Sequence, residues 1–189
     1  MNKRFNARWL ESALASFRRH RIRLYATFVF GYDRDTAETF ARVAEFARRQ
    51  RFYVAAFNHL TPFPGTPLYR RLEAEGRLLY DEWWMDPRYT YNDVPFRPLR
   101  LEPEELRRLC LRIRREFYSL GSIARRMADP VNRSSAFMIR MFPVVNFMIR
   151  GEILQRDGLP LGAREGPEEL LTFEERPAAP HGARGAHAV

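Results

Sequence analysis

The chain has 189 residues, of which 46% are hydrophobic and 29% are charged. This composition excludes a largely disordered protein and suits one modest core or part of a larger one. Its single cysteine, Cys110, excludes an internal disulfide and a cysteine-rich metal site. The net charge of +9 comes from arginine and one lysine, Lys3, and it fits either a GC-rich genome or contact with an anionic partner.

Targeting signals are not evident in the sequence. The N-terminal residues carry no apolar core of a secretory signal, and no stretch reaches the roughly 18 apolar residues of a membrane span. Together with the low cysteine content, this predicts a cytoplasmic protein.

The first half of the chain has the pattern of a parallel sheet. Apolar spacing predicts a helix over residues 7–19, and β-branched and aromatic residues predict strands over 22–30 and 52–60. Between the strands, Asp35 and Glu38 match a capping box that opens a helix. Two apolar strands joined by a helix form a βαβ unit. One such unit leaves apolar sheet edges exposed, so the sequence predicts part of a larger sheet.

The middle of the chain lacks regular periodicity. The TPFPGTPLY segment at residues 61–69 predicts a loop, because proline and glycine interrupt regular elements. Thr66 and Pro67 then predict the start of a short helix that ends near Gly76. Residues 80–101 are rich in aromatic residues and proline, and we expect an ordered extended segment packed over a neighbour.

The second half is expected to be mainly helical. Residues 102–128 start with a proline at position 103 and repeat apolar residues on one stripe, which predicts one long helix with Cys110 on its buried face. Residues 134–150 are apolar on nearly every side, and burial between other elements is the expectation, with membrane-surface contact as the alternative. The Pro-, Ala- and Gly-rich residues 172–189 are expected to be disordered.

Two segments, in this order, carry a resemblance to a known family. FVFGYDRDTAETF at residues 28–40 and FNHLTPFPGTPLY at residues 57–69 resemble the fifth and sixth strands of radical SAM proteins with an N-terminal cobalamin-binding domain. Residues 94–127 resemble the extension that follows the barrel in the same group, which includes hopanoid-methylase-like proteins. The resemblance covers roughly residues 1–160.

The resemblance implies an α/β fold that is a partial (β/α) barrel. Residues 1–79 would form the last βα units of a radical SAM TIM-like barrel, residues 80–101 a connector, residues 102–160 a helical C-terminal extension and residues 161–189 a polar, largely disordered tail. The full-length family implies S-adenosylmethionine, a four-iron four-sulfur cluster and cobalamin as cofactors.

The Cys-x3-Cys-x2-Cys motif that holds the cluster in this family is absent from the sequence. We therefore expect no metal site and no cofactor bound by this chain alone. The chain is expected to be a C-terminal fragment, with a complementing N-terminal chain as the alternative.

Four residues are candidates for lining the S-adenosylmethionine site. Active-site groups of barrel enzymes lie at the carboxyl ends of strands, and the resemblance places Gly31, Tyr32, Asn58 and Thr61 there. Structural alternatives stay open: a turn at Gly31, a solvated loop at Tyr32, backbone hydrogen bonding by Asn58 and the start of the proline loop at Thr61. His59 faces the other side of its strand and is only a weak acid–base candidate, so no catalytic residue is assigned.

Two functions remain open at this stage. The first is lining a site for methyl transfer or related radical chemistry on a small or lipid-like substrate, by a chain that is not competent alone. The alternative is a non-catalytic basic module that contacts nucleic acid or an anionic membrane surface through the arginines of residues 102–128. No nucleic-acid motif occurs, so nucleic acid is not the expected partner, whereas peripheral membrane contact stays open.

Overall fold

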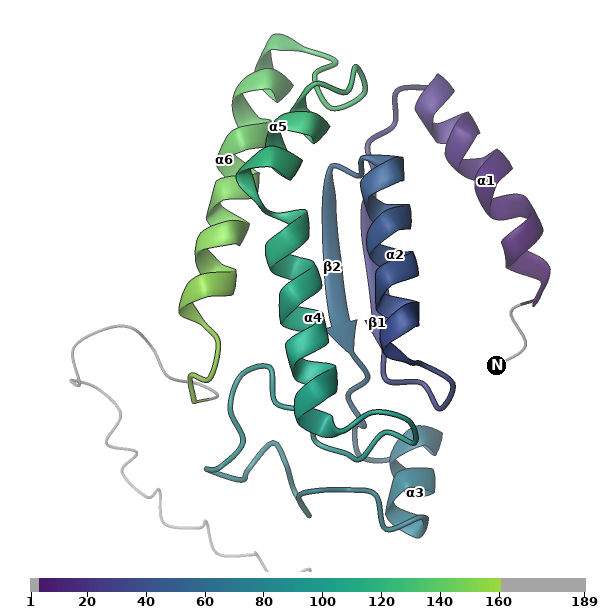
Figure 1. Ribbon diagram of the computed structural model, residues 1–189, viewed down its shortest axis with the longest axis vertical. Coiled ribbons are helices and arrows are strands. Elements are labelled where there is room, and N and C mark those ends of the chain that lie inside the picture. The colour runs from purple at the N-terminus through teal and green to yellow at the C-terminus, as the bar shows by residue number, and fades with distance from the viewer. Residues whose placement is uncertain (1–3, 161–189) are drawn as a thin grey trace, which may run out of the picture.

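The computed structural model describes residues 4–160 (Figure 1). Over this range the order of elements is α1 (Arg4–Arg19), β1 (Tyr25–Phe30), α2 (Ala37–Gln50), β2 (Val54–His59), α3 (Pro67–Ala74), α4 (Pro103–Phe117), α5 (Leu120–Met127) and α6 (Ala136–Gln155). None of these helices is both long enough and apolar enough to cross a membrane. The expected disordered tail lies outside the described residues.

The predicted βαβ unit is confirmed. β1 and β2 form a two-stranded parallel sheet in which Phe28 is paired with Phe57, and α2 makes the crossover between them. The partial barrel stays a prediction, because the described sheet has two strands. Within residues 4–160, no further strand pairs with the outer edge of β1.

The start of α2 differs from the predicted capping box. The N-cap is Thr36 rather than Asp35, and the backbone N–H of Thr36 donates to Oγ1 of Thr39 (3.2 Å). Asp35 serves another purpose, because its carboxylate binds the backbone at the end of β1.

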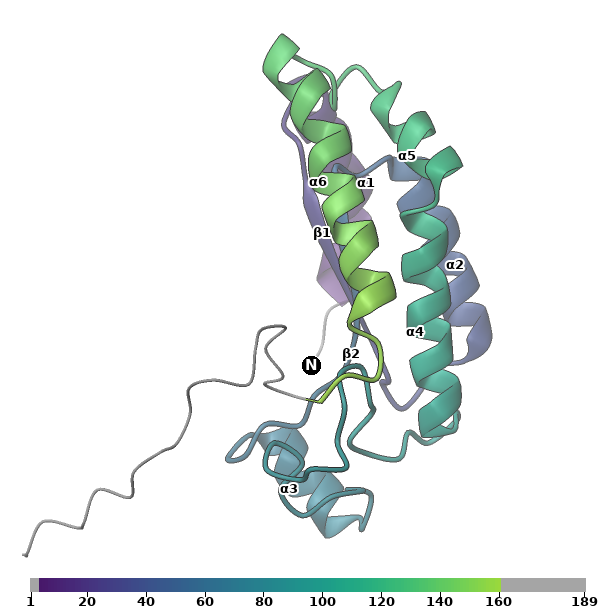
Figure 2. The same cartoon turned by 90° about the vertical axis from the view of Figure 1, so that its left-hand side faces the viewer.

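One face of the sheet is covered by α2 and α4, which lie side by side over it (Figures 1 and 2). Side chains of this face alternate along each strand, as the strand period of two requires. The rings of Phe28 and Phe57 stack at 5.2 Å between centroids, and Phe30 stacks on Phe40 of α2 at 4.0 Å. Helix α4 completes this core with Leu106, Leu109, Cys110, Ile113 and Phe117.

The opposite face of the sheet, called the bare face below, is open over β1 within the described residues, whereas Val54 and Ala56 of β2 on this face are half-buried. Tyr25, Thr27 and Val29 of β1 alternate with the covered residues and are all exposed, Tyr25 at 67%. Asn58 of β2 is exposed beside Val29, its partner in the register. A largely apolar face without a covering layer is unusual in a stable sheet, because such faces normally pack on another element.

The outer edge of β2 is closed by side chains of the helical extension. The Tyr118 hydroxyl donates to the carbonyl oxygen of Ala55 and accepts from its N–H group. Arg126 of α5 donates to the carbonyl oxygens of Phe52 (3.3 Å) and Tyr53 (3.1 Å), just before the strand. The two edges of the sheet therefore differ, since among the described residues side chains bind the backbone groups at the edge of β2 but not those at the edge of β1.

The single helix predicted over residues 102–128 is wrong. The chain breaks after Phe117 into α4 and α5, and the Oγ atom of Ser119 caps α5 by accepting from the N–H of Ser122 (3.3 Å). The break lets Tyr118 turn toward β2 and brings Arg126 against the ring of Phe117 at 4.0 Å. Cys110 is buried as predicted.

Helix α6 runs through Pro143 and corrects the burial expected for residues 134–150. Phe142 and Asn146 are fully buried, but Phe137, Val144 and Met148 are exposed. Burial therefore holds for only one face of the helix.

The predictions for the middle segment are confirmed. Thr66 caps α3 by accepting from the N–H of Tyr69 (3.2 Å), with Pro67 in its first turn. Residues 80–101 contain no helix and no named strand, yet the side chains of Trp83, Tyr89 and Phe96 are buried. The indole N–H of Trp83 donates to the carbonyl oxygen of Pro62 (2.9 Å), which ties this segment to the proline loop.

Candidate functional site

The carboxyl ends of β1 and β2 meet at one end of the sheet. Because the strands are parallel, Gly31 and Leu60 follow them side by side, and the N–H of Leu60 donates to the carbonyl oxygen of Phe30 (2.7 Å). Gly31, Tyr32, Asn58 and Thr61 therefore belong to the same end of the sheet.

Gly31 is fixed by backbone conformation and by packing. Its φ of +97° is a conformation that residues with a Cβ rarely adopt. A Cβ atom here would lie 3.1 Å from Cδ2 of Leu106 and 3.1 Å from Cζ of Phe96. The space beside Gly31 is thus filled by other side chains of the protein. This favours the interpretation of Gly31 as a turn residue over its interpretation as a residue that lines a ligand.

The loop after Gly31 is held by Asp35. Its Oδ2 atom accepts from the N–H groups of Gly31 (2.9 Å) and Tyr32 (3.0 Å). These bonds to a carboxylate are stronger than neutral hydrogen bonds, so they fix the backbone where β1 ends. The Tyr32 side chain itself is 53% exposed and can reach a ligand.

Asn58 is the candidate that faces the bare side of the sheet. Its Oδ1 atom accepts from Nη2 of Arg114 (3.3 Å), and Arg114 also donates through Nε to the carbonyl oxygen of Phe57 (2.7 Å) and through Nη1 to Asn92 (2.5 Å). A guanidinium can only donate, which fixes the amide orientation of Asn58. The Asn58 amide group therefore offers its N–H donors to whatever lies over the bare face.

Thr61 lies at the same end and is half-buried, directly before Pro62 of the proline loop. The structure thus brings all four candidates to one end of the sheet. It also adds Arg114 and Asn92, which sequence reasoning missed. No local signal marks these two residues, because they reach Asn58 from segments far along the chain.

His59 points to the covered side of the sheet, away from Asn58, as predicted. Burial lowers its pKa to about 4, and the positive charge of Arg114 adds to this effect, with Asp93 opposing it. Within residues 4–160 its Nδ1 atom has no hydrogen-bond partner. A neutral imidazole that does not face the open side can support the site but has no route to a ligand there.

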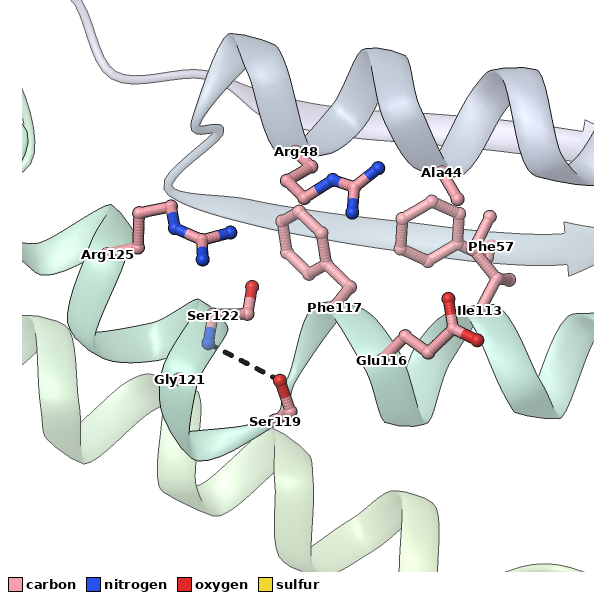
Figure 3. Close-up of a pocket in the computed structure, with 10 residues that line it drawn as sticks. All are labelled: Ala44, Arg48, Phe57, Ile113, Glu116, Phe117, Ser119, Gly121, Ser122 and Arg125. Atoms are coloured by element: carbon pink, nitrogen blue, oxygen red, sulfur yellow. Dashed lines mark hydrogen bonds between the residues drawn. The ribbon is translucent and has the colours of Figure 1, made fainter.

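A pocket of about 380 Å³ lies between α2, α4 and α5, on the helix-covered side of the molecule (Figure 3). Phe57, Ile113 and Phe117 form its apolar floor, and Arg48 and Arg125 flank it. None of the four candidate residues lines this pocket. It is therefore a separate feature from the strand ends.

Metal-binding chemistry is not supported by the described part of the chain. Residues 4–160 contain no group of three His, Cys, Asp or Glu side chains placed to hold a metal ion. Burial raises the pKa of the Cys110 thiol to about 12, so this cysteine stays protonated, whereas cluster ligation needs thiolates. The residues present do not fit an iron–sulfur cluster.

Comparison with known proteins gives two relatives. The chain is 32% identical over 123 residues to a bacteriochlorophyllide d C-12(1)-methyltransferase of Chlorobaculum tepidum, a match that covers 65% of this chain and 26% of that enzyme. It is 34% identical over 61 residues to a hopanoid C-2 methylase of Rhodopseudomonas palustris, covering 32% of this chain and 12% of that enzyme. The chain thus spans about a quarter or less of each relative. No protein-family profile and no solved structure matches it.

Both relatives are named for the addition of a methyl group. The chain is therefore similar to part of two methyl-transferring enzymes. Its strand ends supply hydrogen-bond donors and a shaped backbone, so the chemistry they favour is binding and orientation.

Proposed function

We propose that this chain is the C-terminal part of a cobalamin-type radical SAM methyltransferase and that its strand ends help to line the S-adenosylmethionine and substrate site. Two relatives with methyl-transferring names support the reaction class. The fragment status, the cobalamin type and the role of each residue belong to the proposal.

The observation that carries the proposal is the asymmetry of the sheet. One face is covered by α2 and α4, the other is bare, and the edge of β2 is closed while the edge of β1 is unpaired within residues 4–160. This is the arrangement expected for the last two strands of a barrel, with helices outside and the bare face turned inward. Further strands would add at β1.

The chain's own residues would bind and orient ligands. The Asn58 amide, held by Arg114, offers N–H donors to acceptor atoms such as adenine nitrogens or a carboxylate. Tyr32 adds a hydroxyl group beside a backbone fixed by Asp35. Val29, which is paired with Asn58 near the end of β1, gives the bare face an apolar surface there, which suits a small or lipid-like substrate.

Neither the iron–sulfur cluster nor cobalamin is assigned to residues of this chain. The single buried thiol of Cys110 cannot supply three thiolates, so the proposal places both groups on another part of the polypeptide or on a complementing chain. An in-frame Cys-x3-Cys-x2-Cys sequence in the DNA just upstream would support the fragment interpretation. A long unrelated sequence there would argue against it.

The ligand-lining role can be tested by nuclear magnetic resonance on the purified chain. We expect saturable amide shifts at Gly31, Tyr32, Asn58 and Thr61 on titration with S-adenosylmethionine to millimolar concentration. Asn58→Asp removes the donors at nearly constant shape and should weaken binding about tenfold. Shifts confined to the pocket beside Arg48, or no shifts at the four positions, would contradict the proposal.

A further inference from the structure

Helix α6 exposes a row of large apolar side chains. Phe137, Val144, Phe147 and Met148 are 64%, 48%, 49% and 65% exposed. Their spacing of three, four or seven residues places them along one side of the helix, over a length of roughly 16 Å. We call these four residues the α6 stripe.

The exposure of the stripe does not mean that α6 is detached from the core. The other side of α6 is attached to the body of the protein: Phe142 and Asn146 are buried, and the rings of Phe142 and Tyr53 lie 5.2 Å apart in an edge-to-face contact. Arg150 donates to the carbonyl oxygen of Tyr118 (2.9 Å). The helix therefore has two apolar sides, one packed and one presented to the outside.

Basic residues accompany the stripe. Arg140 is exposed and falls in the same row, three residues after Phe137 and four before Val144, and Arg133 is exposed just before the helix. From Pro130 to the end of α6 the one acidic residue is Glu152, four residues after Met148, and its Oε1 atom lies 3.7 Å from Nη2 of Arg156, which offsets its charge. Long arginine side chains can keep their charge at the level of lipid headgroups while neighbouring apolar side chains enter the acyl region.

We propose that the α6 stripe is a peripheral attachment site for an anionic lipid bilayer, with α6 lying in the plane of the membrane surface. The exposed Phe, Val and Met are accompanied by the exposed Arg133 and Arg140, while Glu152 is offset by Arg156, so the stripe keeps an excess of positive charge that matches such a surface.

The position of α6 favours a bilayer over further strands of the sheet as the partner of the stripe. α6 lies on the β2 side of the sheet, where the edge is already closed by Tyr118 and Arg126 (Figures 1 and 2). The unpaired edge belongs to β1, on the opposite side. Strands that continue the sheet would therefore pair with β1 and not at the edge beside α6.

The test is co-sedimentation of the whole chain with phosphatidylglycerol vesicles and with phosphatidylcholine vesicles. We expect binding to the anionic vesicles, weakened by added salt. The variant Phe137→Ser/Val144→Ser/Met148→Gln should lower the partition coefficient at least about tenfold. Arg133→Gln/Arg140→Gln should lower binding to the anionic vesicles about tenfold.

Matched controls come from other exposed residues of the same chain. Phe63, Leu99 and Met85 are 56%, 62% and 72% exposed, so Phe63→Ser/Leu99→Ser/Met85→Gln removes comparable apolar surface elsewhere. Arg34→Gln/Arg70→Gln removes two exposed charges elsewhere. Both controls should leave vesicle binding within about twofold of the unmodified chain, since charges and side chains far from the surface contribute little. Circular dichroism and thermal midpoints establish that every variant is folded.

Three outcomes would overturn the proposal. The first is no vesicle binding by the unmodified chain, and the second is equal loss of binding in the α6 and control variants. The third is a concentration-dependent dimer that the α6 variant abolishes without any vesicle binding, because a second copy of the chain would then be the occupant of the stripe.

Discussion

The hydroxyl group of Tyr118 donates to the carbonyl oxygen of Ala55 (2.9 Å) and accepts from the N–H group of the same residue (3.1 Å). On the free edge of a strand, these two backbone groups would otherwise need another strand or water. Tyr118 is only 1% exposed, so one side chain takes the place of a neighbouring strand near the start of β2. This contact joins the helical extension to the sheet.

Replacing this hydroxyl should destabilise the protein. Tyr118→Phe keeps the ring in the core but leaves the N–H and carbonyl groups of Ala55 without their partner. We expect the free energy of unfolding to fall by about 2 kcal/mol, measured by urea denaturation. Tyr32→Phe removes an exposed hydroxyl and should change the same quantity by less than about 0.5 kcal/mol. Equal effects of the two variants would show that the Tyr118 contact is not stabilising.

Gly31→Ala should be among the more damaging single-methyl changes in the chain. The residue would have to hold a φ of +97° and place its Cβ 3.1 Å from both Leu106 and Phe96. We expect a loss of about 2–3 kcal/mol in the free energy of unfolding. At Gly151, inside α6, a Cβ would meet no heavy atom within 4 Å. Gly151→Ala should therefore be neutral or stabilising by up to about 1 kcal/mol, and the reverse order of the two variants would refute the strain argument.

Asp35 offers a test of the loop that carries Tyr32. One oxygen atom accepts both N–H groups, so the amide oxygen of Asp35→Asn can replace it, although without the charge. We expect Asp35→Asn to cost about 1 kcal/mol and Asp35→Ala about 2 kcal/mol or more. Hydrogen exchange at the Gly31 and Tyr32 amides should speed up strongly only in the alanine variant. Unchanged exchange in that variant would mean that Asp35 does not hold the loop.

The two strands and the helix between them could be predicted because each is marked by a local sequence pattern. Apolar β-branched and aromatic runs predict β1 and β2, and the intervening stripe that includes Phe40 and Ala47 predicts α2. The strand period also predicts that Asn58 and His59 face opposite sides, as they do. The placement of Asn58 on the bare face follows from this alternation.

The break between α4 and α5 could not be predicted from periodicity. Apolar residues continue at seven-residue intervals from Leu106 through Ile113 and Leu120 to Met127, so the stripe passes through the break without interruption. The cause is tertiary, because Tyr118 must leave the helix axis to reach Ala55. Ser119 then supplies the cap that makes a second helix start favourable.

The sequence also could not predict which arginines form an exposed basic surface. Several arginines that suggest a basic surface bind inside the molecule: Arg114 holds the end of β2, Arg107 lies 2.7 Å from Asp157, and Arg126 is buried. Without their partners in view, such residues cannot be separated from the exposed arginines of a binding surface. Their partners lie far away in the sequence, so no local pattern reveals them.

Cys110 should be chemically inert in the folded protein. Its pKa is raised to about 12 by burial, and the reactive species is the thiolate. Ellman's reagent should therefore not react with the native chain and should titrate one thiol after unfolding in guanidinium. Reconstitution with iron and sulfide should give no cluster absorbance, with or without Cys110→Ser. A cluster that forms and depends on Cys110 would contradict the finding that this thiol is buried and protonated.

His59 should make stability depend on pH. Burial, aided by Arg114, lowers its pKa from 6.5 to about 4, so the unfolded chain binds more protons than the folded chain between these values. The contribution of the neutral imidazole is complete above pH 6.5 and is lost as the pH falls toward 4, by up to about 3 kcal/mol. His59→Gln should flatten the pH dependence of the free energy of unfolding in this window.

His20→Gln is the matched control, since His20 is exposed and stays hydrated in both states, and its curve should follow that of the unmodified chain. Because carboxylates titrate near the lower end of the window, the quantity to compare is the difference between each variant and the unmodified chain. If the two variants give the same difference, the burial of His59 is not what makes stability depend on pH.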